Sequence, residues 1–212
     1  MMRLLVVSPP GTHRTIAARR LAMRLPAPGP ETRHYYELAG LLEAYPDPYA
    51  HPVAPFRAPH YTVSAIGLVG CMGPRPMAFD RRGAACTAEG PRRFRPGEAH
   101  LAHGGILFLD ELMEFRRSTL ESLRYVLDDG GHYPARPVAV IATAMPCFCG
   151  HKGDTRVGAR QCRCSVESLA RYEARLTELA AILGLVRVDV TAPATFAEGN
   201  ERIAGWSEGL PE

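Results

Sequence analysis

The chain has 212 residues, of which 46% are hydrophobic and 22% are charged, and its formal net charge is +3. This length and hydrophobic content allow one well-packed core and leave little room for a second domain. Because the sequence has no run of 18 apolar residues and no secretory leader pattern, it excludes a membrane-spanning helix, and we expect a cytoplasmic protein.

The first predicted element is a short apolar strand at residues 3–7. It is followed by Ser-Pro-Pro-Gly-Thr-His-Arg-Thr at residues 8–15, and then by a helical pattern over residues 16–25. A strand, a glycine-containing turn and a helix in this order are the context of a phosphate-binding loop, whose pattern is Gly-x-x-x-x-Gly-Lys-Ser/Thr. The chain therefore begins with an altered version of this loop.

Each alteration of the loop has a physical meaning. Ser8 and His13 replace the two glycines, and the Cβ of His13 makes a close approach to phosphate oxygens more costly. Arg14 keeps the charge of the lysine, but its planar group needs more room. Thr15 fits and offers a hydroxyl to Mg²⁺, while the helix N-terminus offers amide donors. We predict impaired hydrolysis and an anion-binding loop formed by Pro10, Gly11, Thr12, His13, Arg14 and Thr15.

The next part of the chain has weak patterns. Residues 38–42 favour a helix of poor definition, and residues 46–96 contain many of the 19 prolines. Proline-rich segments interrupt both helices and central strands. We therefore expect residues 46–96 to form an irregular excursion from the core.

The most informative stretch is Ile-Leu-Phe-Leu-Asp-Glu at residues 106–111. A continuous apolar run is typical of a strand buried on both faces, and acids at its carboxyl end lie where open α/β sheets bind ligands. Asp110, together with Thr15, is the candidate Mg²⁺ ligand, and Glu111 is the candidate residue that orients water for hydrolysis. The alternative is a buried strand that ends in a solvated acidic turn, and the hexapeptide alone does not decide between them.

The remaining core elements follow in order. The sequence predicts an amphipathic helix at residues 114–127 with a Ser118–Glu121 capping box, a buried strand at 137–142 and a long helix at 165–183. The apolar face of the first of these helices consists of Phe115, Leu120, Leu123 and Leu127. Strands that alternate with helices predict an α/β fold with a doubly wound parallel sheet.

Four of the six cysteines form two Cys-x-Cys pairs, Cys147 with Cys149 and Cys162 with Cys164, separated by twelve residues. Paired thiols at the two ends of a loop predict a structural zinc site with four thiolate ligands. The usual spacing is Cys-x-x-Cys, so reduced free thiols and a disulfide remain open as alternatives.

Several stretches together carry a family resemblance. The chain resembles the AAA+ core of magnesium-chelatase-like proteins, most closely the ComM/YifB group. The matching segments are residues 9–12, 55–60, 101–115, 133–136, 146–150 and 171–172. The resemblance implies a P-loop NTPase core that uses ATP and Mg²⁺ and forms a homo- or hetero-oligomeric ring with related AAA+ subunits. By analogy with ComM-type relatives alone, it also implies a link to DNA processing.

The resemblance also implies boundaries and further site residues. It places the AAA+ core at residues 1–190, with a cysteine-rich loop at 147–164 and a short tail at 191–212 that leaves the helical lid incomplete. Met145 stands where the family has a sensor asparagine, and it cannot hydrogen-bond in the same way. Arg187 is the candidate for the family's trans-acting catalytic arginine, with an ordinary edge charge as the alternative.

Three functions remain open at this point. The first is a degenerate ATP-binding AAA+ module with weak or absent hydrolysis that acts as a subunit or regulatory partner. The second is an active ATPase motor linked to DNA processing, in which Arg14 replaces the lysine. The third is an interaction protein that binds no nucleotide and keeps only the fold. The sequence does not decide whether the chain is an enzyme.

Overall fold

A computed structural model describes residues 1–41, 53–73, 77–79, 85–87, 94–128, 133–156 and 158–190, with backbone alone at 77–79 and 85–87. The predicted tail at 191–212 lies outside the described residues, and so do residues 129–132. Among the described helices, none is both long and apolar enough to cross a bilayer.

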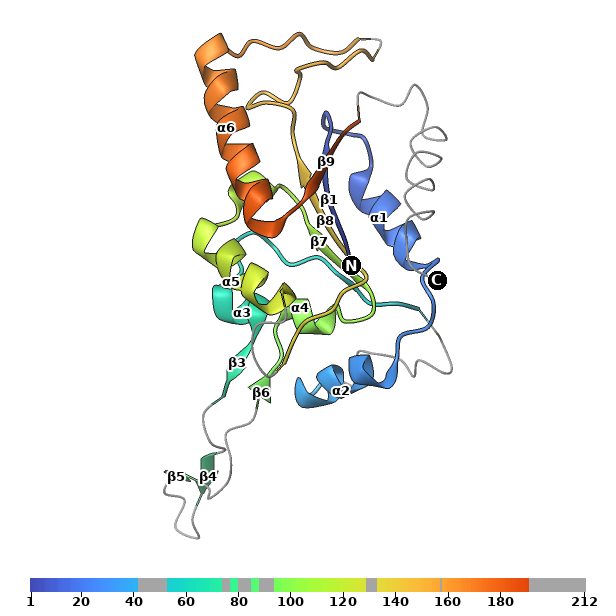
Figure 1. The fold of residues 1–212 in the computed structure, drawn as a ribbon, viewed down its shortest axis with the longest axis vertical. Helices are drawn as coiled ribbons and strands as arrows, with labels where there is room; N and C mark the ends of the chain where they lie inside the picture. The colour runs from blue at the N-terminus through green and yellow to red at the C-terminus, as the bar shows by residue number, and fades with distance from the viewer. Residues whose placement is uncertain are drawn as a thin grey trace.

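The core is a parallel sheet of five strands in the order β2-β7-β8-β1-β9 (Figure 1). These strands are β1 (Met2–Val7), β2 (Phe56–Arg57), β7 (Ile106–Leu109), β8 (Ala139–Ala144) and β9 (Val186–Asp189). Every pairing in this sheet is parallel, which confirms the predicted fold class. Because β1 lies between β8 and β9, the strand order reverses beside β1, and open sheets bind ligands at the carboxyl ends of strands at such a point.

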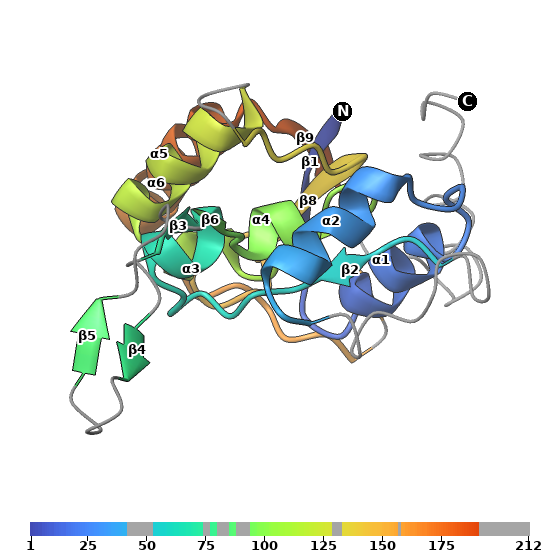
Figure 2. The same ribbon diagram turned by 90° about the horizontal axis from the view of Figure 1, so that it is seen from below.

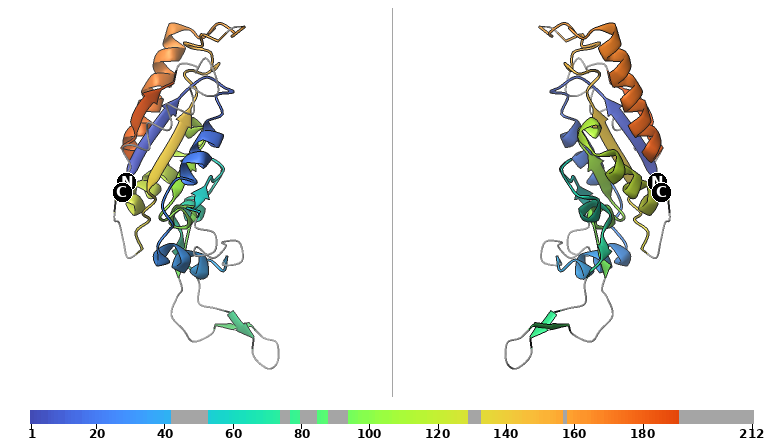
Figure 3. Two further views of the ribbon diagram at one scale, coloured as in Figure 1. Left: turned by 90° about the vertical axis from the view of Figure 1, so that its right-hand side faces the viewer. Right: turned by 90° about the vertical axis from the view of Figure 1, so that its left-hand side faces the viewer.

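Helices cover both faces of the sheet, with α1 on one side and α5 and α6 on the other (Figures 2 and 3). The helices of the core are α1 (Arg14–Ala22), α2 (Pro30–Leu38), α3 (Ala65–Val69), α4 (Glu98–Leu101), α5 (Arg117–Leu127) and α6 (Val166–Leu183). Leu5 and Leu107 pack in a cluster with α3, α5 and α6, whereas Val6 and Phe108 pack in a second cluster with α1. Alternate residues of a strand point to opposite faces, so strands covered on both sides must be apolar throughout.

Several predicted elements are found with shifted bounds. The strand predicted at residues 137–142 is β8, which begins and ends two residues later. The helix predicted at 114–127 is a 3₁₀ turn (Leu112–Glu114) followed by α5, and its predicted apolar face is buried as expected. The long helix is confirmed as α6, where the Ser165 hydroxyl caps the N-terminus by accepting from the Ser168 amide at 3.2 Å.

Two local predictions are wrong. The helix predicted at residues 38–42 is not found over its described part, residues 38–41, since α2 begins at Pro30 and ends at Leu38. Proline in the first turn favours a helix start, and Gly40 has a φ of +69° just after the end. The Ser118–Glu121 capping box is also absent, because the N-cap of α5 is Arg116 and makes no side-chain cap bond.

The segment expected to be irregular contains short regular elements among its described residues. Beside β2 and α3, two antiparallel ladders occur, β3 (Cys71–Met72) with β6 (Phe94–Arg95) and β4 (Met77–Phe79) with β5 (Ala85–Thr87). Both ladders lie to one side of the five-stranded sheet, and β4 and β5 lie farthest from it (Figure 1). Strands of two or three residues have no period that a sequence pattern can reveal.

Candidate functional site

The carboxyl ends of three strands bring the predicted loop and the acidic pair to one edge of the sheet. Val7 of β1 pairs with Ala144 of β8, and Leu109 of β7 pairs with Ala142. The loop starts at Ser8, directly after β1, and its amide donates to the Ala144 carbonyl at 3.1 Å. Asp110 follows β7 two strands away, a separation of roughly 10 Å. The predicted anion-binding loop and predicted Mg²⁺ ligand therefore share the ligand-binding edge of the fold.

The backbone of the loop has a conformation that glycine adopts more easily than other residues. His13, at the position of the second glycine, has φ 53° and ψ 33°, which lie in the left-handed region. Gly11 has a φ of +79°. A left-handed residue with a Cβ costs roughly 1–2 kcal/mol. Thus the chain has lost the glycine and kept its backbone geometry, and such outliers concentrate at ligand sites.

Arg14, at the position of the lysine, is directed at backbone carbonyls. Its Nη1 donates to the Ala144 carbonyl at 3.0 Å and to the Ser8 carbonyl at 3.4 Å. Inside the loop, the Thr12 hydroxyl donates to the Pro9 carbonyl at 3.1 Å. The charge at this position therefore stabilises the ends of β1 and β8 and the start of the loop.

The other predicted loop residues lie at the entrance to α1. Pro10 and Gly11 are exposed, and Thr12 is half-buried. Thr15 is half-buried in the first turn of α1, so its hydroxyl lies near the N-terminus of this helix. All six predicted loop residues thus lie in the turn after β1 and in the first turn of α1.

A residue that the sequence interpretation missed holds the acidic pair in place. Thr143 of β8 is fully buried, and its hydroxyl donates to Oδ1 of Asp110 at 2.5 Å. The same hydroxyl accepts a hydrogen bond from the Glu111 amide at 3.0 Å. Glu111 itself is left-handed, with a φ of 57°. The available signal was a threonine inside an apolar strand, level with the two acids.

Met145, at the expected sensor position, follows β8 directly. Its carbonyl accepts a hydrogen bond from the Tyr172 hydroxyl of α6 at 2.7 Å. Burial is the main cause that raises the pKa of Tyr172 to about 12, so this hydroxyl remains a donor at neutral pH. The backbone at the sensor position is thus fixed to α6, although its side chain offers no strong hydrogen-bonding group.

Arg187 lies on the edge strand β9, opposite Leu5 in the middle of β1. Its guanidinium pairs with Asp189, at 2.9 Å between Nη2 and Oδ1, and also with Glu173 of α6. The structure does not bring Arg187 to the edge where the loop and acidic pair meet. A trans-acting arginine would serve the site of a neighbouring subunit, so the role of Arg187 stays a prediction beside the alternative of an ordinary edge charge.

The four paired cysteines gather into one cluster, with all four Sγ atoms within 4.8 Å of one another. The Sγ atoms of Cys147, Cys149 and Cys162 are 3.4–3.7 Å apart. A tetrahedral zinc with bonds of about 2.3 Å needs sulfurs about 3.8 Å apart, and a disulfide needs about 2.05 Å. The backbone amides of Arg163 and His151 lower the pKa of Cys149 to about 6, which favours the thiolate. The donor set and its spacing therefore fit a metal ion.

The loop between the two cysteine pairs packs against the phosphate-loop turn. A Cβ added to Gly150 would lie 3.2 Å from Cδ of Pro10, and a Cβ added to Gly11 would lie 3.4 Å from Nη1 of Arg156. Arg156 is held by Asp154, at 2.9 Å from Nε to Oδ1 and 2.7 Å from Nη2 to Oδ2. The sequence indicated neither contact, because the two loops are about 140 residues apart in the chain.

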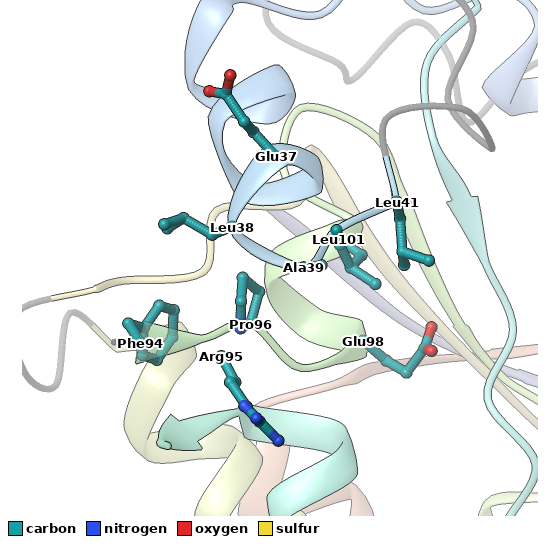
Figure 4. Close-up of a pocket in the computed structure, with 10 residues that line it drawn as sticks. Glu37, Leu38, Ala39, Leu41, Phe94, Arg95, Pro96, Glu98 and Leu101 are labelled. Atoms are coloured by element: carbon teal, nitrogen blue, oxygen red, sulfur yellow. The ribbon is translucent and has the colours of Figure 1, made fainter. Parts of the chain in front are cut away.

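A separate hollow of about 700 Å³ lies between α2, β6 and α4 (Figure 4). Apolar side chains such as Leu38 and Leu101 line it together with the charged Arg95 and Glu98. It is close to α4, near the end of the sheet where β7 begins (Figure 1), whereas Asp110 follows the last residue of β7. This hollow is not part of the candidate site.

Comparison with known proteins agrees with this architecture. The sequence profile described as "Magnesium chelatase, subunit ChlI" matches residues 2–195. YifB of Salmonella typhimurium is 35% identical over 186 residues, which cover 82% of this chain and 32% of that protein. The competence protein ComM of Haemophilus influenzae is 32% identical over 185 residues, which cover 82% of this chain and 31% of that protein. The chain thus spans about a third of the length of these relatives.

Among solved structures, NtrX of Brucella abortus is similar with a TM-score of 0.44 and 19% identity, covering 90% of this chain and 32% of that one. The family assignment rests on the match of the sequence profile to nearly the whole chain and on the parallel sheet with its loop after β1. The chain belongs to the magnesium chelatase subunit ChlI family and has the α/β core of an AAA+ P-loop NTPase.

Proposed function

We propose that this chain is an ATP-binding AAA+ module, spanning residues 1–190, with weak or absent ATP hydrolysis, which acts as a subunit or regulatory partner of related AAA+ proteins. The observation that carries the proposal is the shared edge at which the altered loop and the acidic pair meet. There Thr143 fixes the acids while Arg14 donates to backbone carbonyls. This arrangement keeps a binding site and redirects the charge that would act on the transferred phosphate.

Binding is supported by what remains of the site. The turn before α1 offers backbone amides and the positive end of a helix to phosphate oxygens. The Thr15 hydroxyl and the Asp110 carboxylate are oxygen ligands of the kind that Mg²⁺ prefers, and when bound the ion would neutralise part of the phosphate charge. The four-cysteine cluster would hold a structural zinc beside the same turn.

Weak hydrolysis is supported by the groups that have changed. Glu111 keeps the carboxylate that orients water, but Met145 cannot hydrogen-bond to water or to a phosphate as asparagine does. Nη1 of Arg14 already donates to two carbonyls, so the guanidinium would have to give up these hydrogen bonds to reach a phosphate as the lysine does. Two of the groups that stabilise charge in the transition state are therefore changed.

The binding part is tested by thermal unfolding with Mg·ATP and with Mg·ADP. A ligand at 100 times its dissociation constant adds about 2.7 kcal/mol of stability. For a chain of this length we expect an increase of about 5–10 °C in the unfolding temperature. An unchanged unfolding temperature at millimolar nucleotide would refute ATP binding and leave the interaction protein as the better interpretation.

The hydrolysis part is tested by phosphate release from the wild type, Glu111→Gln and Glu114→Gln. Glu114 is an exposed acid three residues away, so its variant controls for the change in net charge. We expect equal background rates in all three proteins. A wild-type rate that falls at least tenfold in Glu111→Gln alone would instead establish the active ATPase.

A further inference from the structure

At the position where the phosphate loop has its lysine, the proposed nucleotide site has an arginine that is partly committed to backbone carbonyls. Lysine at position 14 would be a flexible point charge for the phosphates. Instead, Nη1 of Arg14 lies 3.0 Å from the Ala144 carbonyl and 3.4 Å from the Ser8 carbonyl. One nitrogen of Arg14 is thus occupied by neutral acceptors, and a second positive side chain near the loop would add to the binding of a polyphosphate.

Arg156 lies at the right place to supply that charge. A Cβ at Gly11, in the middle of the loop, would have Nη1 of Arg156 as its nearest neighbour, at 3.4 Å. Gly11 is left-handed with a φ of +79° and carries no side chain, so the guanidinium lies directly over exposed backbone. The loop of the phosphate site and Nη1 of Arg156 thus face one another.

The position of Arg156 is fixed on the side away from Gly11. Asp154 binds Nε and Nη2 with both carboxylate oxygens, at 2.9 Å and 2.7 Å, and its side chain is only 1% exposed. That pairing uses one edge of the guanidinium and leaves the Nη1 edge for a second acceptor. A guanidinium can bind two oxyanions in this way because it has five donors in one plane.

The cysteine cluster closes the loop that carries Arg156 and Asp154. Arg156 lies in the loop that Cys149 and Cys162 close, and the Sγ atoms of these two cysteines are 3.6 Å apart. The same loop contacts the phosphate turn a second time, through Gly150 beside Pro10. A loop closed at both ends by one cluster can hold a side chain over a neighbouring turn with little freedom to leave.

We propose that Arg156, carried by the cysteine-closed loop, is a second positive group that binds the polyphosphate of a nucleotide in this chain, beside the residue at position 14. The inference rests on the proposed nucleotide binding. Asp154 is its positioning residue. The ligand class is a nucleoside triphosphate, bound through its phosphate chain and not through its base.

The test uses the full chain, purified with zinc, and titrations of Mg·ATP and of inorganic tripolyphosphate followed by calorimetry. Arg156→Ala should weaken both ligands about 10- to 100-fold, the range expected for a lost charge-assisted hydrogen bond. Arg160→Ala is the matched control, because Arg160 is an exposed arginine of the same loop and should leave both affinities unchanged. Arg156→Lys should recover part of the affinity.

The possible outcomes separate the two proposals. If Arg156→Ala binds both ligands as the wild type does, the inference is wrong and the proposed function stands. If the wild type binds neither ligand, both are wrong. If Arg156→Ala unfolds, Arg156→Gln decides, since it keeps most of the side chain and removes the charge. Affinity at least threefold weaker in Arg156→Gln supports the inference, and wild-type affinity overturns it.

Discussion

Replacing Thr143 with valine should show how strongly the acidic pair depends on one buried hydroxyl. The two side chains have nearly the same shape, so Thr143→Val keeps the packing of β8 and removes the bonds to Asp110 and to the Glu111 amide. Loss of a charge-assisted bond to an exposed carboxylate and of a neutral bond costs about 2–3 kcal/mol. Burial of the new methyl group offsets this cost by less than about 1 kcal/mol. We expect a net loss of about 2 kcal/mol.

Urea unfolding measures this loss directly. With a slope of about 2 kcal/mol per molar urea, the midpoint should fall by about 1 M with the slope unchanged. Thr143→Ser is the control, because it keeps the hydroxyl although it loses a methyl contact. Its unfolding temperature should still rise with Mg·ATP, as that of the wild type is expected to do. In a cycle with Asp110→Ala, the interaction between the two positions should be about 1 kcal/mol. A loss below about 0.5 kcal/mol in Thr143→Val, or strictly additive effects, would refute the role of the hydroxyl.

Two further predictions concern the metal cluster and the buried histidines. Purified protein should contain about one zinc per chain, and Cys147→Ser should lose it and unfold at least 10 °C earlier, because a structural zinc stabilises as much as a whole small domain; a zinc ratio near zero after metal-replete expression would contradict this. Burial lowers the pKa of His100 and His103, so both are neutral in the fold while the unfolded chain takes up protons below about pH 6.5. The contribution of these two neutral histidines to the free energy of unfolding is therefore fully present above about pH 6.5. It should fall as the pH drops to 5.5, which urea unfolding can measure. His100→Gln should reduce this pH dependence, and an equal dependence in both proteins would show that His100 is not its source.

The sequence predicted the parts of the fold that have long patterns. The apolar run of β7 is typical of a strand buried on both faces, and Ser165 followed by a long periodic segment is typical of a helix start. The strands of two or three residues, such as β2, could not be predicted, because their place depends on pairing with β7 and not on their own composition. The same limit explains the helix expected at residues 38–42, where three leucines suggested a period that Gly40 ends.

The candidate site was predictable only to the level of its elements. Asp110, Glu111 and the loop at residues 8–15 were recognisable because each follows a predicted strand. Thr143 and Arg156 were not, since each acts through a contact between segments that are far apart in the chain. To predict such contacts one must know the register of β7 with β8 and the packing of one loop on another. Local sequence patterns contain neither.

The strained backbone at the site supports the proposed binding module over a protein that keeps only the fold. Among the described residues, His13 and Glu111 are the two left-handed residues other than glycine, and both lie at the same edge of the sheet. His13→Gly and His13→Ala test whether that strain is real. At a helix N-cap glycine is already favoured over alanine by under about 1 kcal/mol, and a left-handed backbone should raise this difference to about 2 kcal/mol. Urea unfolding of the two variants measures the difference. A difference below about 1 kcal/mol would mean that the loop relaxes in solution and would remove the strain as support for a retained ligand site.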